Sequence, residues 1–128
     1  FFECRCLPNG DSGSLAIYRD ITQRRLAEAR IERLAYYDTL TGLPNREWLL
    51  EHLRRELARD PAAPAGLWVL YMDLDQFKRI NDSLGHATGD AVLRMVAERL
   101  RGRLQDLLGS PADGAWQIAR LGGDEFVL

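Results

Sequence analysis

Long apolar segments are missing from this sequence. The longest apolar run covers residues 67–72, far short of the ~20 residues that a transmembrane helix needs. The first residues also lack the basic-then-apolar layout of a signal peptide. We therefore expect this stretch to be cytoplasmic, with any membrane anchor of the parent protein lying upstream of it.

Cysteine is scarce, since Cys4 and Cys6 are the only two. Alternate positions on a strand place both thiols on one face, without the geometry of a relaxed disulfide. We expect both to be reduced. A metal pair is the alternative, but there is no third cysteine, and the two histidines are remote in sequence.

A basic excess is also missing. The chain has 17 Lys and Arg against 19 Asp and Glu, for a formal charge of -2, and therefore has no broad basic field to hold a nucleic-acid backbone. We expect no nucleic-acid polymer as a partner. The 128 residues, 46% of them apolar, are enough for the core of one globular domain.

The first third of the chain predicts two strands and a helix. Residues 1–20 alternate apolar and polar side chains around a turn. Two strands cannot bury a core alone, so we expect them to end a domain that begins upstream. Residues 21–37 contain no Gly or Pro, and Ala27, Ile31 and Leu34 form a narrow helical stripe. Pairing with a second copy and a solvated connector explain this stripe equally well.

The remaining chain predicts alternating helices and strands. Asn45 occupies an N-cap position before a helix that runs to about Arg59. The apolar segment 67–73 predicts a strand covered on both faces, and Gly109 ends a helix that begins at about Thr88. Two further strands, 116–121 and 125–128, flank a Gly-Gly-Asp turn.

Acidic residues follow the strand at 67–73. Asp73 and Asp75 lie where this strand ends and a helix begins, an arrangement that can hold a divalent cation and the phosphates it neutralises. Lys78 would add a positive charge in the first helical turn. The alternative is that Asp75 only caps the helix and Asp73 is a solvated strand end.

The turn at 122–125 has the second acidic pair. Gly122 and Gly123 fit a tight hairpin with positive φ angles and leave room for a ligand. Asp124 and Glu125 follow, so a turn carboxylate would meet Asp73 if the two strands are neighbours. Two such carboxylates are the usual protein share of a Mg²⁺ site, although a Gly-Gly-Asp hairpin is also a common surface turn.

Three motifs in order resemble the GGDEF family of diguanylate cyclases: "DTLTGLPNR" (38–46), "DLDQFKRINDSLGHATGD" (73–90) and "ARLGGDEFVL" (119–128). The resemblance implies an α/β fold of the α+β type, similar to nucleotide cyclases and polymerase palms, with a mainly antiparallel central sheet flanked by helices. It implies that 38–128 is the N-terminal part of the domain, incomplete at its C-terminus. The preceding segment resembles a PAS exit, with the last PAS strands at 1–20 and a signalling helix at 21–37.

The family's site residues carry over position by position. The resemblance implies that Asp73, Asp124 and the Leu74 carbonyl bind Mg²⁺ (or Mn²⁺). It implies that the phosphates and base of GTP lie against Gln76, Phe77, Lys78, Asn81, Asp90, Gly122 and Gly123, with Asn81 and Asp90 reading guanine. Asp124, Glu125 and Lys78 are then the catalytic set.

Two more family features concern bracing and feedback. Asp38 and Arg46 resemble a pair that braces the turn before the catalytic domain. Asp113 and Trp116 stand where the product site for cyclic di-GMP has Arg and Asp, so we expect no product inhibition there, and Trp116 to be structural.

The resemblance implies a diguanylate cyclase that condenses two GTP molecules in a homodimer, under an attached sensory domain. The alternative is an inactive GTP-binding domain that regulates an attached phosphodiesterase domain.

Overall fold

The computed structural model describes residues 1–9, 13–58, 66–110 and 116–128. It contains two compact units, Phe1–Leu34 and Ala35–Leu128, which are described separately. Within the described ranges, no helix combines the length and the apolar character needed to cross a membrane.

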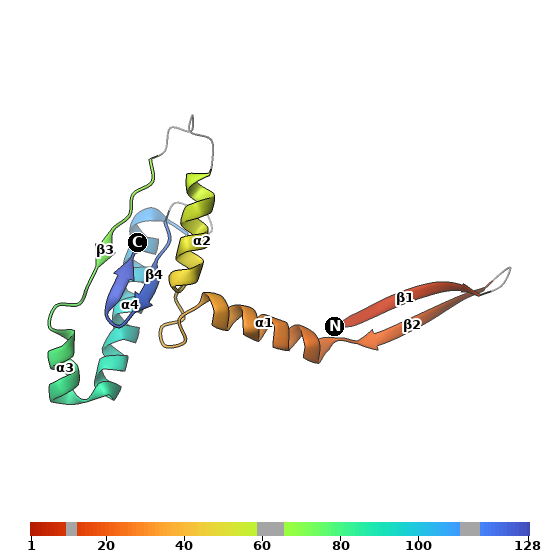
Figure 1. Cartoon of the computed structure of the whole chain (residues 1–128), viewed down its shortest axis with the longest axis horizontal. Helices are drawn as coiled ribbons and strands as arrows, with labels where there is room; N and C mark the ends of the chain where they lie inside the picture. Colours follow the sequence, from red (N-terminus) through yellow and green to blue (C-terminus); the bar gives the residue numbers. More distant parts are fainter. Residues whose placement is uncertain (10–12, 59–65, 111–115) are drawn as a thin grey trace. The chain divides into compact units, whose positions relative to one another are not determined.

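The first unit consists of a hairpin and most of a helix. Strands β1 (Phe2–Asn9) and β2 (Gly13–Asp20) pair antiparallel, with Phe2 opposite Asp20. Helix α1 (Thr22–Tyr36) follows at once (Figure 1), and the Asp20 carboxylate accepts a hydrogen bond from the Thr22 amide at 2.8 Å. No residue of α1 is buried. The order of two strands and a helix agrees with the sequence pattern, while the predicted turn lies outside the described residues and the PAS assignment stays a prediction.

The described part of the second unit combines helices with a small antiparallel sheet. Helices α2 (Arg46–Leu57), α3 (Phe77–Leu84) and α4 (His86–Leu108) accompany strands β3 (Tyr71–Met72), β4 (Ala119–Gly122) and β5 (Glu125–Val127). The strand order is β3-β5-β4, and both pairings are antiparallel. The predicted fold class, an antiparallel sheet flanked by helices, is confirmed.

The core of this unit lies between α4 and the sheet, because α4 passes behind β4 and β5 (Figure 1). Its buried members come from α3, α4, β5 and the segments before α2 and β4: Leu43, Phe77, Leu93, Ala97, Trp116, Ile118 and Phe126. The core therefore fixes the β4–β5 turn relative to the start of α3.

Local chemistry sets several element ends. The Asn45 side chain accepts a hydrogen bond from the Trp48 amide at 3.0 Å, as expected of a helix N-cap. Gly109, at φ 81°, ends α4 in a conformation that favours glycine. Both predictions are confirmed.

The predicted buried strand at 67–73 is wrong in length and burial. Only Tyr71 and Met72 form β3, although Leu70 also exchanges two backbone hydrogen bonds with Leu128. Trp68 is 84% exposed. The reason is that β3 lies at the edge of the described sheet and pairs with β5 alone. Although this segment is apolar, the structure does not cover it on both faces.

Candidate active site

The first feature of the site is the meeting of two acidic segments. Met72 of β3 pairs with Phe126 of β5, so the strand end that carries Asp73 lies beside the turn that carries Asp124. The charge of Asp124 is one of the causes that raise the pKa of Asp73, as expected of two carboxyl groups that lie close together. The sequence predicted that these carboxylates lie close together if their strands are neighbours. The pairing of β3 with β5 makes the strands neighbours.

Two glycines make this turn possible. Gly122 has φ 145° and Gly123 has φ 54°, both in the region that L side chains rarely adopt. The β4–β5 register shifts between Arg120 and Gly122, which is a β-bulge. The predicted positive φ angles are confirmed, and both glycines are exposed.

Negative charge accumulates at the meeting point. Desolvation and the neighbouring charges of Asp124 and Glu125 raise the pKa of Asp73 above its usual value. A hydrogen bond to Glu125 raises the pKa of Tyr71 to about 12. The sequence reasoning did not include Tyr71, whose place beside these carboxylates depends on the pairing of β3 with β5. The carboxylates of Asp73, Asp124 and Glu125 repel one another, and a bound cation would reduce this repulsion.

The donor set fits a Mg²⁺ ion that shares its shell with substrate. No described group of three or more His, Cys, Asp or Glu side chains is arranged to hold a metal, and the ligands expected from the sequence are two carboxylates and a carbonyl. Mg²⁺ usually takes one or two carboxylates and completes its shell with phosphates and water. The Leu74 carbonyl already accepts the Phe77 amide at 3.1 Å, which leaves it a second lone pair.

The start of α3 has an unusual backbone. Gln76, at φ 59°, is the only non-glycine described residue with positive φ, a conformation that costs on the order of 1 kcal/mol. Asp75 is therefore not the N-cap, because Gln76 takes that position without a side-chain cap. Phe77 is buried in the core, whereas Lys78 is exposed. A phosphate role for these residues stays a prediction.

The predicted guanine-reading residues lie on adjacent helices. Asn81 is on α3 and Asp90 is on α4, and both are partly buried. These helices pack against each other. The Asn81 Oδ1 is buried and has no hydrogen-bond partner among the described residues.

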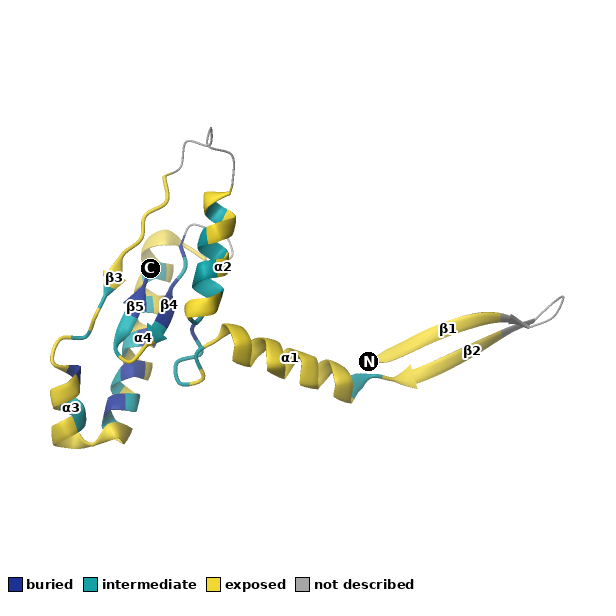
Figure 2. Cartoon of the chain, viewed as in Figure 1, coloured by how far each residue is buried: buried dark blue, intermediate teal, exposed yellow. Residues whose placement is uncertain are grey.

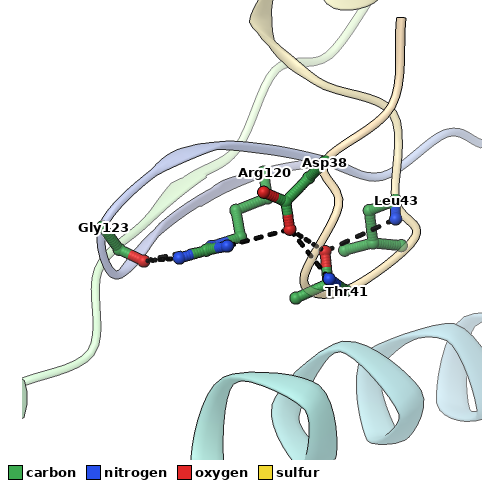
Figure 3. Close-up of polar contacts among 5 residues, drawn as sticks. All are labelled: Asp38, Thr41, Leu43, Arg120 and Gly123. Atoms are coloured by element: carbon green, nitrogen blue, oxygen red, sulfur yellow. Dashed lines mark hydrogen bonds and ion pairs between the residues drawn. The ribbon is translucent and has the colours of Figure 1, made fainter. Parts of the chain in front are cut away.

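A network of hydrogen bonds connects the glycine turn to Asp38 and Thr41 (Figure 3). Asp38 Oδ1 accepts hydrogen bonds from the Thr41 amide at 2.9 Å and hydroxyl at 2.6 Å, and from Arg120 Nη1 at 2.8 Å. The remaining guanidinium nitrogens of Arg120 donate to the Gly123 carbonyl, Nε at 3.0 Å and Nη2 at 2.6 Å. One buried arginine therefore joins the turn after α1 to the turn that carries Asp124.

This network corrects the expected bracing pair. Asp38 takes part, but its partner is Arg120, and Arg46 is an exposed residue at the start of α2. Burial alone would raise the pKa of Asp38, but hydrogen bonds from Thr41 and Arg120 outweigh it and hold this pKa below its usual value. The sequence signal that could have indicated Arg120 is its place two residues before the glycine pair.

A family model described as "Diguanylate cyclase, GGDEF domain" matches residues 35–128. The chain belongs to the GGDEF family. This GGDEF domain is 43% identical over 112 residues to the signaling protein YkoW of Bacillus subtilis, covering 88% of the chain and 13% of YkoW. It is 44% identical over 102 residues to the cyclic di-GMP phosphodiesterase NbdA of Pseudomonas aeruginosa, covering 80% of the chain and 12% of NbdA.

Among solved structures, the coiled coil and GGDEF domain of DgcB from Caulobacter crescentus, in complex with c-di-GMP, superposes with a TM-score of 0.70 at 33% identity. The match covers 84% of this chain and 52% of that one. The chain spans between 12% and 16% of the length of the curated relatives that it matches.

Of the two residues expected to replace the product site, the structure describes only Trp116. This side chain is 7% exposed and donates from Nε1 to the Gly109 carbonyl at 3.0 Å, so its structural role is confirmed. Asp113 lies outside the described residues, and the feedback expectation stays a prediction.

Proposed function

We propose that this GGDEF domain is a diguanylate cyclase, which joins two GTP molecules into cyclic di-GMP and releases pyrophosphate. The observation that carries the proposal is the strand register that places Asp73, at the end of β3, beside the intact glycine turn that carries Asp124.

Each residue has a role that follows from its chemistry. Asp73, Asp124 and the Leu74 carbonyl would hold Mg²⁺, which supplies charge neutralisation for the phosphoryl group and pyrophosphate. Asp124 would accept the proton of the attacking 3′-hydroxyl, whose oxygen bonds to the α-phosphorus as the bond to pyrophosphate breaks. Lys78 and the backbone amides at the start of α3 would hold the phosphates, and Glu125 would add negative charge beside them.

Base recognition falls to the α3–α4 pair. A carboxylate at Asp90 can accept the paired N–H groups on the Watson–Crick edge of guanine, but would face an acceptor nitrogen of adenine. Each subunit would hold one GTP, so the reaction needs a homodimer that brings two half-sites together. An attached sensory domain would control that assembly through α1.

A second function is favoured by the relatives. NbdA of Pseudomonas aeruginosa and PdeB of Shewanella oneidensis are named cyclic di-GMP phosphodiesterases, and the chain spans only 12% of each. In that case the domain would bind GTP and regulate an attached phosphodiesterase domain. Asp73 and Asp124 would then serve the binding of GTP with its Mg²⁺, and no cyclic di-GMP would form.

Asp73→Asn and Asp124→Asn in the full-length protein test the choice, with Asp75→Asn as the matched control because it is an exposed carboxyl group at the same strand end. With GTP and Mg²⁺, we expect cyclic di-GMP formation to fall by at least about 10³-fold in the first two and to stay within about twofold in the control. Chromatographic quantification of cyclic di-GMP gives the rates. Wild type without cyclase activity, but with a GTP-dependent phosphodiesterase, would support the second function instead.

A further inference from the structure

Gly89, near the start of α4, lies close to two side chains of α3, Asn81 and Phe77. It is a buried helical residue. A Cβ atom placed on it would overlap the Asn81 Oδ1, and would lie 3.0 Å from Asn81 Cγ and 3.2 Å from Phe77 Cζ. Real Cβ contacts are rarely so close, so any side chain at position 89 would displace Asn81.

Gly102, in the same helix, shows what a glycine without this contact looks like. A Cβ atom at Gly102 would meet nothing within 4 Å. Glycine inside a helix is less stable than alanine because it loses more backbone freedom on folding. At Gly102 alanine should therefore be favourable, whereas at Gly89 the space for the Asn81 amide outweighs the same propensity.

The Asn81 amide, which fills this space, contributes little to the stability of the fold. Its Oδ1 is buried and has no hydrogen-bond partner among the described residues. Leaving a buried acceptor unpaired destabilises a fold, so packing alone gives no reason for an asparagine here. A need for the Asn81 amide beside Asp90 would give such a reason, and Asp90 is the residue that follows Gly89 in the chain.

We propose that Gly89 is a positioning residue that determines guanine specificity: its lack of a Cβ lets the Asn81 amide lie against α4 beside Asp90. This proposal rests on the proposed function, since it takes Asn81 and Asp90 as the residues that read the base. Gly89 itself does not contact the base. It acts by fixing the distance between the two helices that carry the reading residues.

The test compares Gly89→Ala with Gly102→Ala in the full-length protein, each alone and in the Asn81→Ala background. Binding of non-hydrolysable GTP and ATP analogues is measured by calorimetry, and Tm is measured for every variant. We expect Gly89→Ala to weaken GTP-analogue binding about tenfold and to narrow the preference over the ATP analogue. Gly102→Ala should bind like the wild type and have an equal or higher Tm.

The Asn81→Ala background separates positioning from general damage. Without the Asn81 amide, the added methyl group meets no oxygen, so Gly89→Ala should change GTP-analogue binding by less than about twofold there. A Gly89→Ala protein that keeps the wild-type preference, or that loses affinity equally in both backgrounds, overturns the proposal. If Asp90→Asn and the wild type show the same preference, the assignment of guanine reading is itself wrong, and this proposal falls with it.

Discussion

Strands β1 and β2 pair over eight positions, from Phe2 opposite Asp20 to Asn9 opposite Gly13, whereas β4 and β5 pair over three. Yet Phe2 is 70% exposed, and Phe126 in β5 is 1% exposed. Figure 2 shows the contrast, with the described residues of the long hairpin exposed and buried residues in both strands of the short one. The difference is that α4 and Trp116 pack against the short hairpin. Strand pairing therefore sets register in both hairpins, while only packing behind a strand makes a core.

The largest expected effect comes from Phe126→Ala, which would leave a cavity in the core. We expect unfolding of the second unit to become easier by about 3–5 kcal/mol. All three tryptophans, Trp48, Trp68 and Trp116, lie in this unit, so tryptophan fluorescence in urea reports its transition. Ile17→Ala, in the long hairpin, is the control and should leave that transition unchanged. Equal shifts for both variants would show that the two hairpins do not differ in the way described.

Arg120→Met should have the next largest effect, because it removes the partner of the part-buried Asp38 and the donors to the Gly123 carbonyl. We expect a loss of about 2–3 kcal/mol in the same transition. Cyclase activity should fall further than stability explains, because the turn that carries Asp124 loses its support. The control is Arg24→Met, which breaks the exposed Arg24–Glu28 pair of α1 and should have no measurable effect. Retained activity in Arg120→Met would show that the turn holds its shape unaided.

Asn45→Ala should cost about 1 kcal/mol, the usual value for a lost N-cap. Asn45 also donates from Nδ2 to the Ala35 carbonyl at 2.8 Å, so Asn45→Asp separates the two contacts: it keeps the acceptor for Trp48 and loses that donor. The corresponding site in the first unit is Asp20, an exposed residue beside Thr22. Urea denaturation of Asp20→Ala should leave the tryptophan signal unchanged. If Asn45→Asp and Asn45→Ala lose equal stability, the contact to Ala35 carries the effect and the cap does not.

The smallest effect is confined to acidic pH. The pKa of Asp38 in the folded state is below its ordinary value of 3.8, so the stability that this carboxylate contributes is present above pH 3.8 and is lost as pH falls through the folded pKa. Urea midpoints at pH 5 and pH 3 should therefore differ more for the wild type than for Asp38→Asn. An equal pH dependence in both proteins would assign the acid sensitivity to other groups.

Sequence features whose effect depends only on adjacent residues predicted the structure correctly. The Asn45 cap, the Gly109 helix end and the glycine turn depend on the chemistry of a few adjacent residues, and all three are confirmed. The meeting of Asp73 with Asp124 needed one further assumption, that their strands are neighbours.

The predictions that failed depend on partners distant in sequence. Arg120 and Asp38 are 82 residues apart, so the nearby Arg46 was the wrong choice of partner. The apolar segment 67–73 could not reveal that β3 would lie at a sheet edge. Similarly, the positive φ of Gln76 has no signal in its side chain, because it arises where the chain leaves β3 and enters α3.

The position of β5 in the sheet has a consequence for local opening of the chain. Phe126 pairs with Met72 on one side and with Arg120 on the other, so its strand is enclosed although it has only three residues. Amide hydrogens in such a strand exchange with solvent only when the whole unit opens. The glycine turn is therefore attached to the slowest-exchanging segment that we expect in the second unit, and Asp124 is one residue from its start.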